Sequence, residues 1–159
     1  MSVRGEMVKT RLRPTISEAV EQAAASLDHG GGRGLRMLLH AGMSAYWPLV
    51  KAAPVAQVQA YEETLRSLRV RWEAGSGCVG GSDPAAVFAE MDRQMVAFLE
   101  LCAERTGMQW LEPVEAVAAY AVSVLHGTVL RWLADCNDET MLVVLDDLVS
   151  SLAARAAEY

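Results

Sequence analysis

The sequence predicts an all-α fold, with six helices in a single domain. Apolar residues recur three and four positions apart along most of the chain, which is the spacing of one face of a helix. Glycine, proline and short polar segments interrupt this pattern and divide it into six stretches of helical length. No segment alternates apolar and polar residues with the period of two that is typical of a strand. The 159 residues suit one domain with a sizeable core.

The first two helices are separated by a glycine run. A helix is predicted over residues 15–29, because Thr15 and Glu18 have the spacing of a capping box. Gly30–Gly32 should end it, since glycine adopts left-handed dihedrals at no steric cost. A second helix is predicted over about 34–51.

The third and fourth helices flank a glycine-rich segment, residues 75–82. Pro54 suits the first turn of the third helix, which runs to about Glu73. The fourth begins at Asp83-Pro84 and is closed by Gly107. The face of the third helix that we predict to be buried consists of Val55, Val58, Tyr61, Leu65 and Leu68. The inward stripe of the fourth consists of Phe88, Met91, Met95, Phe98, Leu99 and Cys102.

Residues 111–159 predict two long helices joined by a short polar turn. Pro113 opens the fifth helix, and Asn137 or Asp138 caps the sixth. Between Ala116 and Leu130 no residue carries a formal charge when histidine is neutral. A helix that is apolar on nearly all sides must be covered on two sides, and in a chain this small the second cover is most naturally another copy. The pair therefore predicts a dimer.

Composition narrows the setting in which the protein works. The formal net charge of −6 argues against a dedicated nucleic-acid surface, which depends on Lys and Arg. The N-terminal segment lacks the apolar core of a signal peptide, and the uncharged runs at 37–50 and 116–130 are shorter than the roughly 20 residues that cross a bilayer. Cys78, Cys102 and Cys136 form no CxxC pair. We expect a soluble cytoplasmic protein with no membrane partner.

Enzymatic motifs are absent from the sequence. It contains no GxSxG elbow, HExxH pair, DxDxDG loop or phosphate-binding glycine loop. His29, His40 and His126 fall on different predicted helices or at their ends, without the i,i+4 partner that would form a metal face. We therefore expect no catalytic residues, no metal site and no cofactor.

Three segments carry a resemblance to a known family. They are Tyr61–Arg69 (YEETLRSLR), His126–Asp135 (HGTVLRWLAD) and Leu145–Val149 (LDDLV). Together with helix order, they make residues 15–159 resemble the C-terminal ligand-binding and dimerisation domain of TetR-family transcriptional regulators. Such regulators begin with a helix-turn-helix module, which residues 1–14 are too few to build. We expect residues 1–14 to be a flexible tail and the chain not to bind DNA directly.

The resemblance implies a pocket for a small apolar or aromatic effector, enclosed by the second to fifth helices. Mostly apolar walls with a few polar anchors suit such a site. An ordinary packed core is the alternative explanation for the same residues. The candidate ligand-binding residues are His40, Met43, Ser44, Tyr46, Trp47, Tyr61, Met91, Met95, Phe98 and Tyr120.

The resemblance also implies that the last two helices pair with their symmetry mates as a four-helix bundle. The fifth helix has two apolar sides, and the sequence does not say which faces its own core. One side carries Val117, Tyr120, Ala121, Val124 and Thr128, and the other Ala119, Val122, His126, Leu130 and Leu133. The candidate interface residues are Val122, His126, Leu130, Leu142, Leu145, Val149, Leu152 and Ala153.

Two functions follow from this interpretation. The domain could act in transcriptional regulation as an anti-repressor, by pairing with a full-length TetR-family relative into a heterodimer with one DNA reader. Alternatively, it could be a homodimeric sensor or sequestering protein for a small molecule, with no role at DNA. A third explanation is that the chain is a fragment of a longer regulator.

Overall fold

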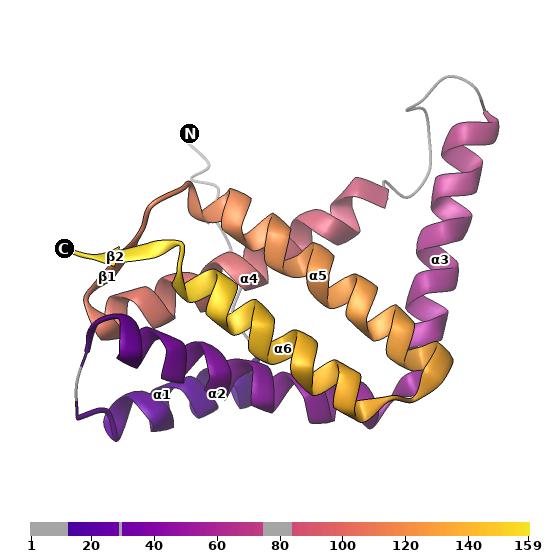
Figure 1. The fold of residues 1–159 in the computed structure, drawn as a ribbon. Helices are drawn as coiled ribbons and strands as arrows, with labels where there is room; N and C mark the ends of the chain where they lie inside the picture. Colours follow the sequence, from indigo (N-terminus) through magenta and orange to yellow (C-terminus); the bar gives the residue numbers. More distant parts are fainter. Residues whose placement is uncertain (1–12, 29, 75–83) are drawn as a thin grey trace, which may run out of the picture.

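The structure is a computed structural model in which residues 13–28, 30–74 and 84–159 are described. These residues confirm the all-α prediction (Figure 1). The glycine-rich segment 75–82, Cys78, His29 and most of the predicted tail lie outside the described residues. The helices are α1 (Pro14–Ala25), α2 (Gly31–Lys51), α3 (Pro54–Glu73), α4 (Pro84–Thr106), α5 (Val114–Asp135) and α6 (Asp138–Ala153).

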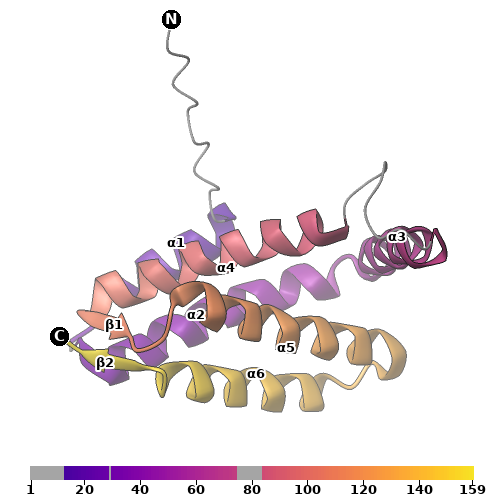
Figure 2. The same cartoon turned by 90° about the horizontal axis from the view of Figure 1, so that it is seen from above.

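The central helix of the fold is α2. It packs against α1, α4 and α6, while α5 packs against α4 and α6. Figure 2 shows α2 between α4 on one side and α6 on the other, with α5 and α6 side by side and antiparallel. The fully buried core side chains come from all of these helices and include Val20, Leu35, Leu38, Leu39, Leu99, Val117, Met141 and Leu152.

The start of α1 differs from the prediction. The helix begins at Pro14 after Arg13, and no side chain caps it. Thr15 therefore lies within the first turn, where it cannot act as the cap of a capping box. Proline is favoured at this position because its fixed φ suits a helix and the missing N–H would have no partner. The helix also ends at Ala25, before the predicted His29.

A short antiparallel pair of strands was not predicted. Met108–Trp110 (β1) pairs with Ala156–Glu158 (β2), and Met108 lies opposite Glu158. Gly107 adopts a φ of +68°, which turns the chain from α4 into β1. Because residues 156–158 pair as a strand, α6 ends at Ala153 and does not continue toward residue 159.

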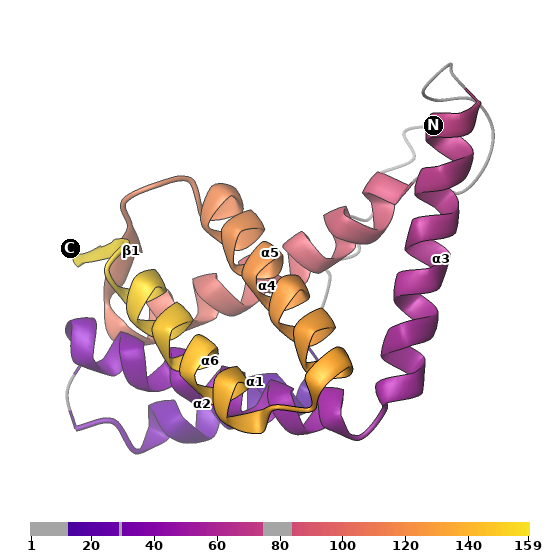
Figure 3. The same cartoon turned by 45° about the vertical axis from the view of Figure 1, so that its right-hand side comes forward.

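The prediction that α3 buries an apolar face is wrong. None of its residues, all of which the structure describes, is buried. Val55 is 68% exposed and Leu65 is 64% exposed. Figures 1 and 3 show α3 standing apart from the other helices, with its first turns nearest the body. The apolar residues of α3 do lie on one side of the helix, as their spacing predicts, but the body of the domain covers only part of that side.

Two tryptophans join the ends of α2, α5 and α6. The ring centroids of Trp47 and Trp132 lie 5.0 Å apart in an edge-to-face arrangement. The indole Nε1 of Trp132 donates a hydrogen bond to Asp138 Oδ1 at 2.8 Å, and Lys51 Nζ lies 2.6 Å from Asp138 Oδ2. These contacts fix where α5 ends and α6 begins. Asn137 caps α6 as predicted, because its Oδ1 accepts from Thr140 N at 3.0 Å.

Among the described residues, α5 is the one helix long and apolar enough to cross a membrane, by length and composition alone. Its most apolar window is 44% buried inside the fold. The core helix of a soluble protein passes the same test, and Val117, Ala121 and Val129 of α5 belong to the core.

Candidate functional site

A pocket of about 180 Å³ lies between α1, α2, α4 and α5, next to the first turns of α3. Its walls are mostly apolar, with methionines contributed by both α2 and α4. Amide and imidazole groups from α3, α4 and α5 add polar atoms, and exposed Arg13 lies at its edge. The lining residues are Arg13, Ile16, Gly42, Met43, Tyr46, Gln57, Met91, Gln94, Met95, Phe98, Val122, Leu125 and His126.

The close approach of α2 and α4 sets the inner wall of this pocket. Gly42 lies against the ring of Phe98, and a Cβ atom at this position would overlap that ring. Phe98 is 4% exposed, so its ring is held by packing on its other sides. The absence of a side chain at Gly42 therefore lets the Phe98 ring approach the backbone of α2 closely.

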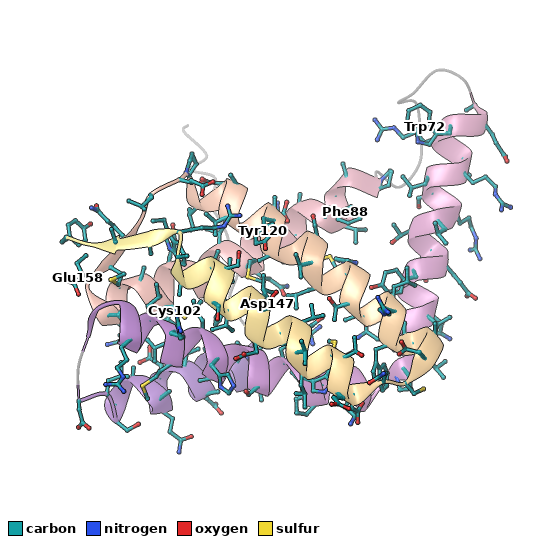
Figure 4. The ribbon with its side chains drawn as sticks, in the orientation of Figure 1. Trp72, Phe88, Cys102, Tyr120, Asp147 and Glu158 are labelled. Atoms are coloured by element: carbon teal, nitrogen blue, oxygen red, sulfur yellow. The ribbon has the colours of Figure 1, made fainter. Side chains whose placement is uncertain are left out.

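His126 lies at the junction of the pocket and α3. Its Nε2 is 2.9 Å from the sulfur of Met91, and its ring lies 5.4 Å from the ring of Phe88. The ring of Tyr61 approaches it edge-on at 5.7 Å, and the Tyr61 hydroxyl donates to the backbone oxygen of His126 at 3.0 Å. Figure 4 shows Phe88 near the start of α4. The imidazole is thus surrounded by two aromatic rings and a thioether.

Burial controls the charge of the polar groups in this region. It lowers the pKa of His126 below its ordinary value of 6.5, against the opposing effect of Asp92. It raises the pKa of Tyr61 to about 12, and nearby Tyr46 adds to this effect. The pKa of Tyr46 is also raised by burial, with Arg13 opposing the shift. At neutral pH, His126 and both tyrosines are therefore uncharged.

The structure brings half of the predicted ligand-binding residues to this pocket. Met43, Tyr46, Met91, Met95 and Phe98 line it, and Tyr61 contacts His126 at its edge.

The other four lie elsewhere. His40 and Ser44 are exposed on α2 and lie within 3.4 Å of each other. Trp47 is packed against Trp132. Tyr120 lies between α5 and α6, where its hydroxyl is 3.1 Å from Ser151 Oγ and its ring contacts Arg155.

Two pocket residues were assigned to the dimer interface by the sequence. Val122 and His126 belong to the side of α5 that packs toward α4, and both line the pocket. Gln57, Gln94 and Leu125 were not singled out at all. The sequence did show that α5 has a second apolar side, which carries Val122 and His126. A helical wheel does not show whether another helix of the same chain or a second chain covers that side.

The other predicted interface residues divide into two groups. Leu145, Val149 and Leu152 are buried in the chain's own core, with 6%, 2% and 0% of each exposed, so they are not free to contact another chain. Ala153 is partly buried. Leu130 and Leu142 are exposed, at 54% and 57%.

The exposed side of the α5–α6 pair, which we call the outer face, carries mostly small residues. A groove of about 270 Å³ runs between the two helices and is lined by residues that include Ser123, Gly127 and Val144. Figure 4 shows Tyr120 and Asp147 on these two helices. Exposed or partly exposed residues of the outer face are Ala116, Ala119, Ser123, Gly127, Leu130, Val143, Val144, Asp147, Ser150 and Ala154.

Within the described parts of the chain, no cluster of three His, Cys, Asp or Glu residues could hold a metal ion. The pocket offers apolar contacts, uncharged hydrogen-bonding groups and, at its edge, the cation of Arg13. Comparison with protein-family models, with curated proteins and with solved structures finds no match to this chain.

Replacing Gly42 with alanine should destabilise the fold and narrow the pocket. Alanine is the better helix former by about 1 kcal/mol, but overpacking costs about 1–3 kcal/mol. Because the new methyl group overlaps the Phe98 ring, we expect a net loss in the free energy of unfolding, measured by urea denaturation. The matched control is Gly32→Ala in the same helix, where the added atom meets only Met108 at 4.0 Å. Equal stability of the two variants would contradict this account of Gly42.

His126 should make stability depend on pH. Its pKa is lower in the folded state than its ordinary 6.5, so the unfolded chain binds a proton first as pH falls. Above pH 6.5, neutral His126 leaves the free energy of unfolding at its full value. That free energy decreases as the pH falls through and below 6.5, because the unfolded chain then takes up the proton more readily than the folded one. Urea denaturation at a series of pH values should show this slope in the wild type and a smaller slope in His126→Gln. Met37→Gln, at an exposed position of α2 that carries no titratable group, should retain the slope of the wild type.

Proposed function

We propose that the protein is an effector-binding and dimerisation domain of the TetR-like type, which acts in transcriptional regulation. The pocket between α2, α4 and α5 is the observation that carries this proposal. It is enclosed by the helices that the sequence resemblance assigns to the ligand site. Its walls combine flexible methionines with a small number of polar groups, as in sites for small organic molecules.

The effector fits the description of a small apolar or aromatic molecule with one polar group. An apolar cavity of about 150 Å³ accommodates benzene, and this pocket has about 180 Å³. Met43, Met95 and Phe98 would contact the ring or alkyl part. Gln94 and neutral His126 would meet the polar group, while Arg13 at the edge favours a partial negative charge there.

The partner across the outer face is, in this proposal, a second copy or a related regulator. Small residues such as Ser123 and Gly127 permit close approach of helix backbones. Leu130 and Val143, which are 54% and 64% exposed, would be buried by it. Pairing through two helices of each chain would form a four-helix bundle.

The role at DNA can be tested directly. If the domain pairs with a full-length relative, adding it to that relative and its operator in a gel-shift titration should weaken the shifted band. An unchanged band would leave a homodimeric small-molecule sensor as the function. In either case we place the protein in the cytoplasm.

Small aromatic probes should bind in the pocket and raise thermal stability. At a concentration of 100 times Kd, a ligand of the folded state stabilises it by about 2.7 kcal/mol. We expect toluene or indole to raise the melting temperature of the wild type. Val122→Phe should abolish this shift, because the larger side chain fills the pocket that Val122 lines.

The matched control for this blocking variant is Val70→Phe on exposed α3, which should bind the probes as the wild type does. Binding that persists in Val122→Phe, or that neither probe produces in the wild type, would contradict the assignment of the pocket.

A charge on the outer face should prevent pairing through it. Val143→Arg places a cation at a position that is 64% exposed in the single chain, so the fold should tolerate it. We expect the variant to have half the particle mass of the wild type in analytical ultracentrifugation. Val87→Arg, at an exposed position of α4, should not change the mass. An unchanged mass for Val143→Arg would show that this face is not an interface.

A further inference from the structure

Helix α3 carries an exposed apolar stripe at heptad spacing. Val58, Leu65 and Trp72 lie seven residues apart and are 42%, 64% and 78% exposed. Tyr61 and Leu68 lie beside them, three residues after each of the first two, and are partly buried against the body. Val58, Leu65 and Trp72 therefore repeat one position of a coiled-coil heptad, and Tyr61 and Leu68 border them on the side of the body. Figure 4 shows Trp72 near the end of α3 that is far from the body.

The described helices of the body leave this stripe exposed. Among the described residues, the contacts of α3 with the body include packing against α2 and α4 near its first turns and the hydrogen bond from Tyr61 to His126. A surface helix of a globular protein usually turns its apolar side inward. Here Leu65 and Trp72 are among the most exposed large apolar residues of the described chain. The spacing predicts a partner that is itself a helix.

We propose that α3 pairs with α3 of a second copy of this chain in an antiparallel arrangement. The equal spacing of the stripe fits a two-fold axis close to Leu65. Such an axis places Leu65 against Leu65 and Val58 against Trp72 of the second copy. Seven residues span about 10.5 Å of helix. The Leu65 pair and the two Val58–Trp72 pairs are therefore equally spaced along the two helices, and one axis brings all three pairs together. Each small Val58 then lies opposite a large Trp72, which suits close packing.

Charge complementarity selects the antiparallel direction and a second copy as the occupant. Glu62 and Arg69 border the stripe on the same side, because each lies four residues after a stripe residue. In the antiparallel pair, Glu62 of each copy lies near Arg69 of the other. In a parallel pair in register, the edges that carry Glu62 and Arg69 would lie on opposite sides of the seam, so these charges would not meet. Within one chain, Arg69 Nε lies 3.9 Å from Glu73 Oε1, and both side chains are highly exposed. This ion pair is therefore weak and competes little with the contact between Arg69 and Glu62 of the second copy.

This surface is separate from the outer face of α5 and α6. Figure 2 looks along α3 and shows it to one side of the packed helices, beyond the ends of α2 and α4. Pairing through α3 therefore goes beyond the proposed function, and it can be measured in a chain whose outer face has been disrupted by Val143→Arg. In that background, the mass in analytical ultracentrifugation reports α3 pairing alone.

Charge reversal tests the direction of pairing. In the Val143→Arg background we expect a dimer that dissociates on dilution. Glu62→Arg creates two repulsive contacts between like charges, as does Arg69→Glu, so each variant alone should sediment as a monomer at concentrations where the parent is dimeric. An equal mixture of the two should restore the dimer, because each contact then joins opposite charges. Leu65→Glu should raise the dimer Kd by about 30-fold or more.

The matched control is Glu63→Arg, the same charge change on the exposed side of α3 away from the stripe. It should keep the mass of the parent, and circular dichroism should show equal helix content in all variants. The proposal is overturned if the parent is monomeric, if Glu63→Arg dissociates the dimer as fully as Glu62→Arg does, or if the mixture stays monomeric.

Discussion

The apolar surface of α5 is the constraint on which the rest of the structure depends. A helix without charge over several turns must be covered from more than one direction. In this chain α4 covers one side and α6 the other, while Trp47 of α2 packs against its last turns. The chain therefore supplies most of the cover itself. The argument for a partner rests on the narrower strip of small and apolar residues that stays exposed, including Gly127 and Leu130.

Local chemistry made several of the helix boundaries predictable. As predicted, α3 begins at Pro54, whose φ is fixed, and α4 ends before Gly107, whose φ is positive. Asn137 caps α6. Each of these effects depends on a single residue and its neighbours in the sequence. The strand pair was missed because three residues are too few to show a period of two. The exposure of α3 was missed for a different reason. Spacing defines a face of a helix, but packing between distant segments decides what covers it.

The same limit explains the partial prediction of the pocket. On α4 the apolar stripe assigned Met95 and Phe98 to the inside without knowledge of the fold, and the family resemblance added Met43 of α2 to the pocket residues. On α5 two apolar sides are equivalent on a helical wheel. Val122 and His126 therefore fell in the interface set, although α4 packs beside them and places them at the pocket. Gln57 could not be found, because its position depends on how α3 meets the body.

The attachment of α3 connects the pocket to the exposed stripe. Gln57 lines the pocket from the first turns of α3, and Tyr61, one turn later, donates to the backbone of His126. A molecule bound in the proposed site would touch Gln57 of α3 and His126, the residue that accepts the hydrogen bond from Tyr61. It can shift the placement of the helix only to the extent that it binds one placement more tightly than another. Because α3 buries none of its residues, few contacts oppose such a shift. Occupancy of the pocket and pairing of α3 would then be coupled through the same few side chains, and the coupling would act equally in both directions.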